Sequence, residues 1–525
     1  MHLIREVTTL AELPSRVSQY HGQKTALILD DEALDYEGLE RRSNKMARAF
    51  LQRGILPGER IAVLGKESLD SLALLFGTAK ARAVYVSINW RLPTEEIASI
   101  LDDARPRLLF VDGELLSLVP RLLARLAFQP EILALRVPHS DWPSASQWIS
   151  DAPDSAPELA YDPEEVVVQV YTSGTTGLPK GARLASRSFF ALVQEMDARG
   201  DPWLGWTERT VYLSFIPTFH IGGLWALVRG LSLGSTCIVL RTFDPPAILQ
   251  AIPRYRVTKL CAVPAMLHAL LLQPGIRNAE LSSVETVMYG GSSISPSLLE
   301  RAMALFGCGF CQFYGMTETG NVAICMRPED HLGAAPQRRL AAGRPLPGVE
   351  VRILDERRNE LGPGGVGEIA LNSPARMVGY WEQPEASAKT MVDGWVLTGD
   401  VGYRDEDGFV YVCDRLDDLI LCAGENVFSA RIENVLRDQE GVADVAVIGV
   451  PDALWGEAVK ALVMPRPGFT LRVEDIMRHA RARLAGFNVP KSVEFVAQLP
   501  RNAGGKLLKE QLRRPYWQGR ARRVD

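Results

Sequence analysis

Residues 166–181 read VVVQVYTSGTTGLPKG. Val166–Val170 is an apolar run typical of a strand, and Thr172–Gly181 is a loop of small and hydroxyl-bearing residues that includes Lys180. Its glycines let successive backbone N–H groups converge on an anion, while hydroxyls and a lysine add donors and positive charge. Ligands of open α/β sheets bind at the carboxyl ends of strands. The pattern predicts a phosphate-binding loop, and not a Walker A loop, because G-x-x-x-x-G-K-[ST] is not satisfied.

The sequence on both sides of this loop alternates between short apolar runs and amphipathic segments. Helices are expected after Ser68 and over 93–102. Strands are expected at 60–64, 83–88, 108–111, 211–216, 237–240, 259–263 and 284–288. Strands separated by helices predict parallel pairing in a doubly wound α/β sheet. Runs between 343 and 412 indicate a small antiparallel barrel or sheet, and 418–525 indicates a small α+β domain.

Composition excludes several classes of protein. The 525 residues carry 58 Lys and Arg against 63 Asp and Glu, so a net charge of −5 gives no support for a nucleic-acid partner. Seven cysteines are few, which favours a cytoplasmic, reducing location over a disulfide framework. The uncharged stretch 210–228 is long enough to span a membrane, but Pro217 and two glycines interrupt it. We expect a buried strand and a pocket-lining helix there, and no integral membrane segment.

Two other motifs are weak indicators. Gly362, Gly364 and Gly367 match G-x-G-x-x-G, but the EIAL that follows is typical of a strand rather than of the helix that a dinucleotide site needs. Cys308 and Cys311 form C-x-x-C without a second pair at zinc-finger spacing. We interpret the first as a turn and the second as a structural pair.

Further motifs follow the phosphate loop in order along the chain. They are PTFHIGGL at 217–224, YGGSS at 289–293, YGMTET at 314–319, TGD at 398–400, DRLDDLILCAGENVFSARIE at 414–433 and NAGGK at 502–506. With the loop, they resemble the adenylate-forming (AMP-binding) superfamily of acyl-CoA synthetases, adenylation domains and luciferases. The resemblance spans about residues 25 to 510, almost the whole chain.

The resemblance implies a fold and a division into domains. Residues 1–415 would form an N-terminal AMP-binding and acyl-binding domain of doubly wound α/β subdomains plus a small β-barrel. Residues 416–525 would form a smaller, mobile α+β domain that carries the catalytic lysine and part of the coenzyme A site. The hinge between them would be Asp417.

The resemblance also assigns roles in nucleotide binding and catalysis. Tyr314 would stack on adenine, Asp400 would accept from the ribose, and Thr317 would donate to the α-phosphate. Mg²⁺ would be held by Glu318 and Thr176, since carboxylate oxygen is a hard ligand. Catalytic roles would fall to Lys506, Thr317, Glu318 and His220. The nucleotide-binding set is Thr172, Ser173, Gly174, Thr175, Thr176, Gly177, Lys180, Gly291, Ser292, Ser293, Tyr314, Gly315, Asp400 and Arg415.

The second substrate and the acid are assigned in the same way. Residues similar to those of coenzyme A-using members are Arg91, Gly424, Trp455, Phe487 and Lys491. The acyl pocket would be lined by His220, Ile221, Trp225, Val263, Met266, Met288, Tyr289, Gly290 and Val322. These are mostly apolar, which fits a fatty or aryl acid. Phe219–His220 stands where amino-acid-activating domains carry Phe–Asp, so an α-amino acid is not expected.

The chain departs from the family pattern near the hinge. Asp414 and Ser429 replace a glycine and a proline, and Ala423 stands in place of a glycine. Arg431 and Val489 also differ from the usual residues. None of these changes falls on the residues assigned to adenylation. They concern the tunnel through which the thiol would reach the acyl-adenylate.

The predicted function is an ATP- and Mg²⁺-dependent, AMP-forming acyl-CoA ligase that works through an acyl-adenylate. The alternative is an enzyme that passes the same adenylate to a carrier-protein phosphopantetheine thiol. A nucleotide-binding regulator without turnover is a further hypothesis, against which Lys506 and Glu318 argue. The oligomeric state stays open, with a homodimer among the alternatives.

Overall fold

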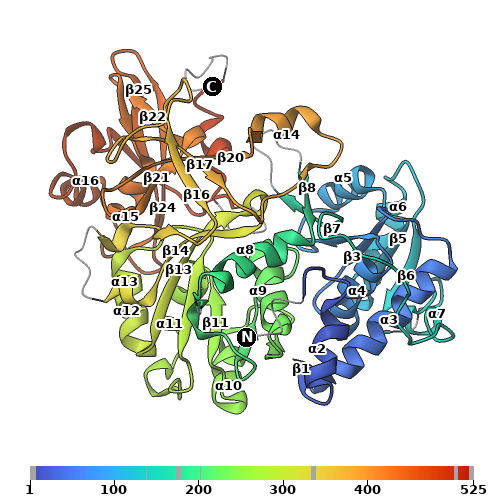
Figure 1. Cartoon of the computed structure of the whole chain (residues 1–525). Coiled ribbons are helices and arrows are strands. Elements are labelled where there is room, and N and C mark those ends of the chain that lie inside the picture. Colours follow the sequence, from blue (N-terminus) through green and yellow to red (C-terminus); the bar gives the residue numbers. More distant parts are fainter. Residues whose placement is uncertain are drawn as a thin grey trace. The chain divides into compact units, whose positions relative to one another are not determined.

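The computed structural model describes residues 7–137, 139–172, 179–201, 203–332, 338–501 and 507–518. The chain divides into two compact units. The first comprises Met1–Ile294, Leu298–Val351 and Leu371–Val396, and the second comprises Ser295–Ser297, Arg352–Ala370 and Leu397–Asp525. Figure 1 follows the chain in colour from its N-terminus to its C-terminus. The predicted domain boundary between residues 415 and 416 stays a prediction.

One sheet of the first unit contains the strand that precedes the phosphate loop. Its order is β18-β8-β7-β4-β3-β5-β6. The strands are β3 (Arg60–Leu64), β4 (Val84–Ile88), β5 (Leu108–Asp112), β6 (Glu131–Leu135), β7 (Val166–Thr172), β8 (Lys180–Ala185) and β18 (Gly379–Tyr380). From β6 to β7 the pairing is parallel, whereas β8 and β18 close the β7 edge in antiparallel pairing.

Helices alternate with these strands along the chain, as predicted, except within the β7–β8 hairpin. They are α3 (Tyr36–Gln52), α4 (Leu69–Lys80), α5 (Thr94–Ala104), α6 (Val119–Leu123), α7 (Ala145–Trp148), α8 (Arg187–Ala198) and α14 (Pro384–Thr390). Helix α4 begins where predicted, because the Ser68 hydroxyl accepts a hydrogen bond from the Ser71 N–H at 3.0 Å. Its apolar face packs against α3.

The other sheet of the first unit runs in the order β15-β14-β13-β12-β11-β9-β10-β1-β2. Its strands are β1 (Thr25–Leu29), β2 (Glu32–Asp35), β9 (Val211–Ser214), β10 (Thr236–Val239), β11 (Lys259–Ala262), β12 (Thr286–Gly290), β13 (Gly309–Met316), β14 (Asn321–Met326) and β15 (Arg344–Pro345). The strands from β1 to β13 are parallel, and β2, β14 and β15 add antiparallel edges.

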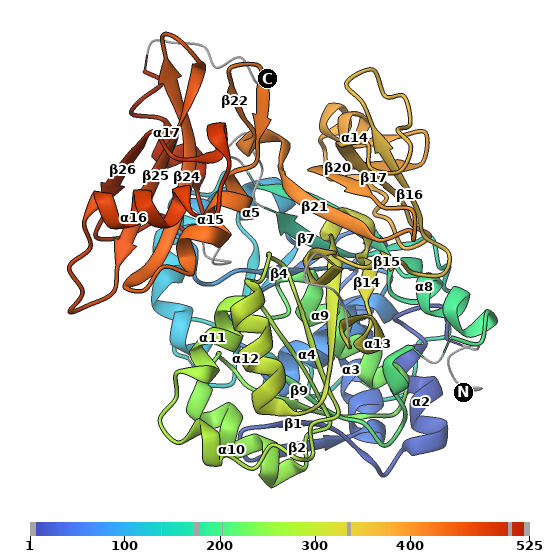
Figure 2. The same cartoon turned by 90° about the vertical axis from the view of Figure 1, so that its left-hand side faces the viewer.

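The helices that pack with this sheet bury an apolar core around Leu260, Val287 and Phe310. They are α2 (Leu13–His21), α9 (Ile221–Ser232), α10 (Pro245–Tyr255), α11 (Pro264–Leu271), α12 (Pro296–Phe306) and α13 (Pro328–His331). Figure 2 shows α10, α11 and α12 along one side of the sheet. The stretch 210–228 forms β9 and most of α9, as predicted. Among the described residues, no helix combines the length and apolarity needed to cross a membrane.

The second unit contains most of a small β-sheet and an α+β part. The small sheet contains β16 (Glu350–Leu354), β17 (Gly367–Asn372), β20 (Trp395–Arg404) and β21 (Val410–Arg415), and β19 (Met391–Val392) pairs with the start of β20. Gly367 begins β17, which confirms the interpretation of the glycine triplet as a turn before a strand.

The α+β part has the strand order β23-β22-β25-β24, with β26 on β25. Its elements are β22 (Ile420–Cys422), β23 (Glu425–Val427), α15 (Ser429–Arg437), β24 (Val442–Asp452), β25 (Gly456–Pro465), α16 (Val473–Arg481), β26 (Ser492–Phe495) and α17 (Lys509–Arg513). Ile432, Val445 and Ile476 share its core. The fold-class prediction, large α/β subdomains followed by a smaller α+β part, is therefore confirmed.

Candidate functional site

The two ends of the predicted phosphate loop are held by a hairpin. Strands β7 and β8 pair antiparallel, and their register brings Thr172 opposite Lys180. The Lys180 ammonium lies 5.2 Å from the centre of the Tyr380 ring, within cation–π range. The predicted residues Ser173, Gly174, Thr175, Thr176 and Gly177 lie outside the described residues.

A buried carboxylate contacts the same tyrosine. Glu318 is 4% exposed, and its Oε1 accepts a hydrogen bond from the Tyr380 hydroxyl at 2.7 Å. The Met377 N–H donates to the Glu318 carbonyl at 2.9 Å, which fixes the backbone of the short helical turn Thr317–Thr319. Burial, followed by the nearby Glu318 charge, raises the pKa of Tyr380 well above its usual range. Tyr380 therefore stays protonated and acts as a donor that orients Glu318.

The predicted adenine residues lie at neighbouring strand ends. β12 and β13 are parallel, with Gly290 paired to Phe313, so Gly291 and Tyr314 follow at the same edge of the sheet. A side chain at Gly290 would put its Cβ 2.4 Å from the Phe313 carbonyl oxygen, and one at Gly315 would put it 1.8 Å from the Asn321 carbonyl oxygen. Only glycine fits these close approaches. Gly291, Ser292 and Ser293 are exposed, as backbone that contacts a ligand must be.

The predicted acyl-pocket residues come from several elements of the first unit. Ile221 and Trp225 lie on α9, Val263 and Met266 at the start of α11, and Met288, Tyr289 and Gly290 on β12, while Val322 lies on β14. Val263 and Met266 are half-buried, and Val263 lies next to Gly291. The Tyr289 side chain is in the core, where its hydroxyl contacts Gln312 and His331.

His220 ends the turn that precedes α9. Its ring lies 4.7 Å from the Phe219 ring, and Arg91 stands 5.5 Å from the Phe219 ring centre. Burial and, to a smaller extent, the positive charge of Arg91 together lower the pKa of His220 to about 4. The imidazole is therefore neutral at physiological pH. The predicted coenzyme A residue Arg91 thus lies beside the acyl motif, a neighbour that sequence spacing did not indicate.

The predicted ribose residues pair in the second unit. Asp400 and Arg415 are opposite each other on β20 and β21, and Arg415 Nε lies 2.9 Å from Asp400 Oδ1. Arg415 Nη1 also donates to the Thr398 carbonyl at 3.0 Å. Glu368 accepts from the Gly399 N–H at 3.0 Å, which fixes the turn before Asp400. Glu368 has no motif of its own and lies about thirty positions before Gly399 along the chain, so the sequence did not predict this contact.

Three predicted coenzyme A residues gather in the small α+β part. Ala423 and Gly424 form the β22–β23 turn with positive φ values of 57° and 82°, so the unusual alanine occupies a conformation that favours glycine. The Ala423 N–H donates to the Trp455 carbonyl at 2.8 Å, and Lys491 Nζ lies 5.4 Å from the Trp455 ring centre. Phe487 is exposed on a separate short turn, Gly486–Asn488.

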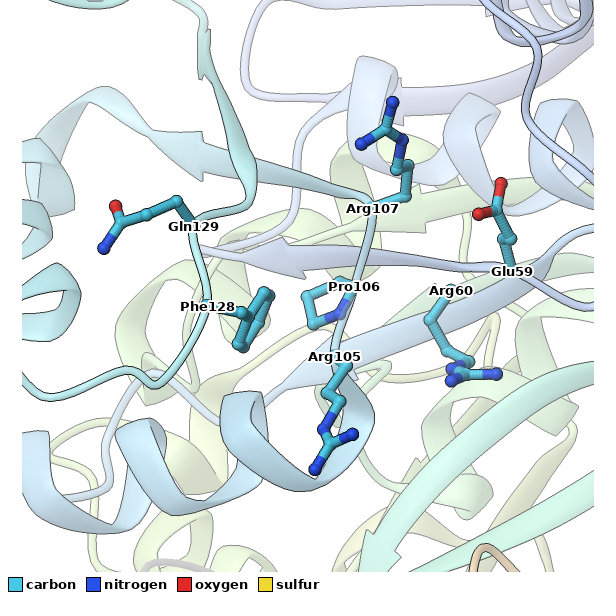
Figure 3. Close-up of a pocket in the computed structure, with 7 residues that line it drawn as sticks. All are labelled: Glu59, Arg60, Arg105, Pro106, Arg107, Phe128 and Gln129. Carbon is cyan, nitrogen blue, oxygen red and sulfur yellow. The ribbon is translucent and has the colours of Figure 1, made fainter.

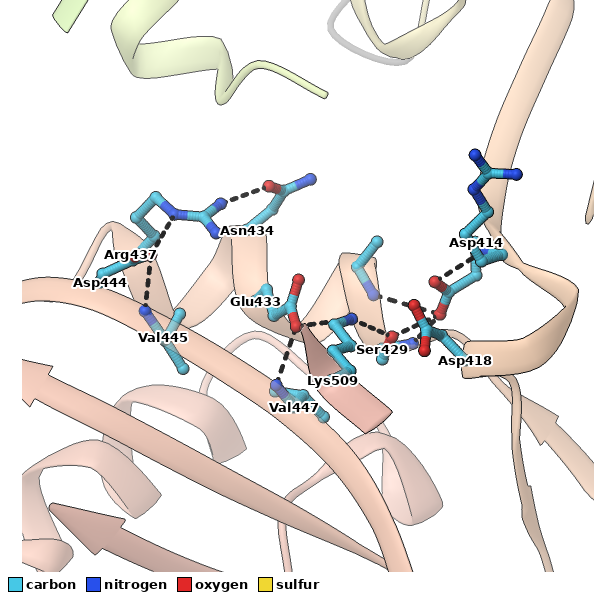
Figure 4. Close-up of polar contacts among 12 residues, drawn as sticks. Asp414, Asp418, Ser429, Glu433, Asn434, Arg437, Asp444, Val445, Val447 and Lys509 are labelled. Carbon is cyan, nitrogen blue, oxygen red and sulfur yellow. Dashed lines mark hydrogen bonds and ion pairs between the residues drawn. The ribbon is translucent and has the colours of Figure 1, made fainter. Parts of the chain in front are cut away.

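Asp414 and Ser429, two of the residues that differ from the family pattern, contact each other. Asp414 Oδ2 accepts from the Ser429 N–H at 2.5 Å and from its hydroxyl at 2.6 Å (Figure 4). Lys509 Nζ donates to the Ser429 hydroxyl at 2.7 Å and pairs with Glu433 at 2.7 Å. Asp414 thus caps the N-terminus of α15. A proline at position 429 would have no N–H and would need no such acceptor. The predicted hinge residue Asp417 lies in the adjacent turn Leu416–Asp418, and the predicted catalytic Lys506 is outside the described residues.

A separate arginine-rich pocket has a volume of about 180 Å³. Its lining is Glu59, Arg60, Arg105, Pro106, Arg107, Phe128 and Gln129 (Figure 3). Arg60 is engaged elsewhere, since its Nε donates to the Ala104 carbonyl at 2.8 Å and its guanidinium lies 3.8 Å from the Trp381 ring centre. The pocket contains none of the predicted site residues.

Comparison with known proteins identifies the family. Residues 14–381 match the family described as AMP-binding enzyme, and residues 431–506 match the AMP-binding enzyme C-terminal domain. The chain belongs to the AMP-binding enzyme family. This membership confirms the predicted family and, with it, the prediction of an enzyme of the ligase class.

Two relatives of the family show how far the similarity extends. The chain is 42% identical to the fatty acid–[acyl-carrier-protein] ligase ScoC of Streptomyces coeruleorubidus, with 99% of each chain covered. It is 36% identical to a feruloyl-CoA synthase of an Amycolatopsis species, with 97% of this chain and 99% of the relative covered.

Solved structures of the family share the fold. The anthranilate CoA ligase AuaEII in complex with anthranoyl-AMP aligns with a TM-score of 0.88 at 25% identity, covering 97% of both chains. ATP-bound MatB from Rhodopseudomonas palustris aligns with a TM-score of 0.86 at 29% identity, covering 96% of this chain and 99% of MatB.

The donor set fits a magnesium ion bound together with nucleotide. Within the described ranges, no group of three His, Cys, Asp or Glu side chains gathers into a metal cage. Mg²⁺ with phosphates needs only one or two carboxylates from the protein. The hydrogen bond from Tyr380 holds one oxygen of the Glu318 carboxylate, and this also fixes the direction in which the other oxygen can bind a metal ion. Tyr380 could not be found from sequence, because it is far from Glu318 along the chain and has no motif of its own.

Proposed function

We propose that this protein is an ATP-dependent, AMP-forming acyl-CoA ligase that activates a hydrophobic carboxylic acid. The observation that carries the proposal is the buried Glu318 carboxylate, oriented by Tyr380, with Lys180 of the phosphate loop on the same ring. A carboxylate on the hydroxyl of one tyrosine and an ammonium near its ring suit a nucleotide whose phosphates are bound with Mg²⁺. The family membership supports the same chemistry.

The reaction has two steps. In the first, a carboxylate oxygen of the acid bonds to the α-phosphorus of ATP, and the bond to pyrophosphate breaks. In the second, the thiol of coenzyme A loses its proton to solvent, and the thiolate sulfur bonds to the acyl carbon. The bond between the acyl carbon and the phosphate oxygen breaks, and AMP leaves with its electron pair. Both steps are displacements, so no oxidant or reductant is consumed.

The residues of this chain bind, orient and neutralise during these steps. Mg²⁺, when bound, neutralises phosphate charge and would be held by Glu318 and Thr176. Lys506 neutralises the carboxylate and α-phosphate as they approach, and Thr317 donates to the α-phosphate. Asp400 accepts from the ribose hydroxyls and is oriented by Arg415 at 2.9 Å.

The acid is hydrophobic because apolar side chains dominate the acyl set. His220 is neutral, so it shapes the pocket beside the acid without adding a second charge. A relative named feruloyl-CoA synthase and one named fatty acid–[acyl-carrier-protein] ligase support an aryl or a fatty acid. Coenzyme A would be bound by Arg91, Gly424, Trp455, Phe487 and Lys491.

The second candidate acceptor is the phosphopantetheine thiol of a carrier protein. The observation that favours it is the 42% identity to ScoC, whose name includes an acyl-carrier protein. Both candidates share the adenylation step and differ only in the thiol.

Pyrophosphate release with ATP, Mg²⁺ and a panel of fatty and aryl acids tests the proposal. We expect pyrophosphate release to require one class of acid. With coenzyme A present, release should continue over many turnovers while the thioester accumulates. Loading of a carrier protein without consumption of coenzyme A would support the second candidate. Absence of pyrophosphate release with every acid, while calorimetry still detects ATP binding, would contradict both and favour a regulator.

A further inference from the structure

A buried carboxylate near the acyl motif has no role in the proposed reaction. Glu67 follows β3 and is 6% exposed. A buried carboxylate is costly unless hydrogen bonds or charges compensate it. Here Glu67 Oε1 accepts from the Thr218 backbone N–H at 2.6 Å and from the Thr218 hydroxyl at 3.0 Å.

These two bonds connect the ends of strands from different sheets of the first unit. Glu67 stands between β3 and α4, and Thr218 stands between β9 and α9. The turn is closed by the His220 N–H, which donates to the Pro217 carbonyl at 3.1 Å. The Leu224 N–H then donates to the His220 carbonyl at 3.1 Å as α9 begins. Glu67 therefore holds the middle of the turn that ends at His220 through its two hydrogen bonds to Thr218.

The start of α9 has little room to move independently of this turn. A Cβ at Gly223 would lie 2.3 Å from the Ile216 carbonyl oxygen and 2.6 Å from the Pro217 carbonyl oxygen. This close approach makes the turn and the first residues of α9 one packed body. A displacement of Thr218 would thus be transmitted to His220 and Ile221.

Compensation for the buried Glu67 comes from the Thr218 bonds and then from Arg91. Burial raises the pKa of Glu67 above its usual value, and the two Thr218 bonds and the Arg91 charge offset part of this rise. The Arg91 guanidinium stands 4.7 Å from the Trp90 ring centre and 5.5 Å from that of Phe219. Glu67 and Arg91 therefore flank the acyl turn with opposite charges.

We propose that Glu67 is a positioning residue that fixes the turn 217–220 and thereby sets where His220 and the start of α9 meet the acid. The proposal rests on the proposed function for the identity of the reaction, but not for the geometry of the turn. It names a specificity determinant outside the acyl motif. Errors of about 1 Å in substrate position can cost on the order of 100-fold in rate.

The test compares Glu67→Ala, Glu67→Gln and Thr218→Val. Removal of both bonds in Glu67→Ala should lower kcat/KM for the acid about 10- to 100-fold, while KM for ATP stays within about twofold. Glutamine retains a carbonyl oxygen as acceptor, so Glu67→Gln should return to within about threefold of wild type. Thr218→Val keeps the backbone donor and should lie between the two.

A matched control is Asp112→Ala in the same unit. Asp112 is also a buried carboxylate at a strand end, 2% exposed, and pairs with Arg241 at 2.9 Å. Its loss should lower the thermal unfolding midpoint without a selective effect on the acid. The positioning role would be overturned if Glu67→Ala, like Asp112→Ala, changed the kinetic constants for the acid and for ATP to the same extent.

Hydrogen–deuterium exchange separates this proposal from the proposed function. Amides of 215–224 should exchange faster in Glu67→Ala than in wild type and at the wild-type rate in Glu67→Gln. If wild type shows no turnover, the proposed function fails, and exchange decides the role of Glu67 by itself. If Glu67→Ala does not fold, Thr218→Val carries the test, and unchanged acid kinetics together with unchanged exchange would refute the proposal.

Discussion

The Tyr380 hydroxyl offers a sharp test of how the Glu318 carboxylate is oriented. Tyr380→Phe removes one oxygen and keeps the ring that lies 5.2 Å from Lys180, so the cation–π contact survives. The variant loses a 2.7 Å bond to a charged acceptor, a contact worth about 1.5–3 kcal/mol. Partners that orient metal-binding groups typically contribute about 10- to 100-fold in metal affinity.

We expect the Mg²⁺ concentration that gives half-maximal pyrophosphate release to rise by about 10- to 100-fold in Tyr380→Phe. At saturating Mg²⁺ most of the rate should return, because Glu318 itself is intact. The assay is a Mg²⁺ titration at fixed ATP and acid, with the unfolding midpoint measured in parallel.

The control for this prediction is Tyr36→Phe. Tyr36 is fully buried in the same unit, and its hydroxyl donates to the neutral Ser235 carbonyl at 2.5 Å. Its loss should cost about 1 kcal/mol of stability and leave the Mg²⁺ response unchanged. An unaltered Mg²⁺ titration in folded Tyr380→Phe, or an equal shift in both variants, would refute the reasoning.

Three further outcomes are expected. Lys506→Ala should reduce adenylate formation by about 100-fold or more and spare thioester formation from preformed acyl-adenylate, and equal loss of both half-reactions would contradict its role. Asp417→Pro, which fixes φ, should impair thioester formation more than adenylation, and unchanged half-reactions would exclude Asp417 as the hinge. The His220 pKa of about 4 lies below the unfolded value of 6.5, so its stability contribution is present above pH 6.5 and is lost as pH falls toward 4. His220→Gln should therefore lose about 2 kcal/mol less stability than wild type between pH 7 and pH 4.5 in urea unfolding, and parallel pH curves would contradict the assignment.

Local sequence signals predicted most of the parallel strands. β3 occupies the predicted residues 60–64, because a charged residue and a glycine bound its apolar run. β12 lies at Thr286–Gly290 rather than at 284–288, since pairing with β11 sets its register and Val284 packs in the core from the preceding turn. Apolar character alone does not distinguish a strand residue from a buried turn residue.

The family motifs predicted residues that contact substrate better than residues that support them. Glu318 was predicted from its motif, whereas Tyr380, its hydrogen-bond donor, arrives through the pairing of β18 with β8. Glu67 and Glu368 escaped prediction for the same reason: each reaches a turn that is distant along the chain. Such contacts depend on tertiary packing, which no local pattern encodes.

The pairing of Asp414 with Ser429 has a consequence for how these two positions can change. Glycine at 414 would leave the Ser429 hydroxyl and N–H without their carboxylate acceptor. Proline at 429 would remove two donors from the buried Asp414 carboxylate, and the Ala430 N–H at 3.3 Å would remain. We therefore expect a single change at either site to be less favourable than a change at both. We expect the two sites to be energetically coupled, so that Asp414→Gly or Ser429→Pro alone lowers stability more than the two changes made together.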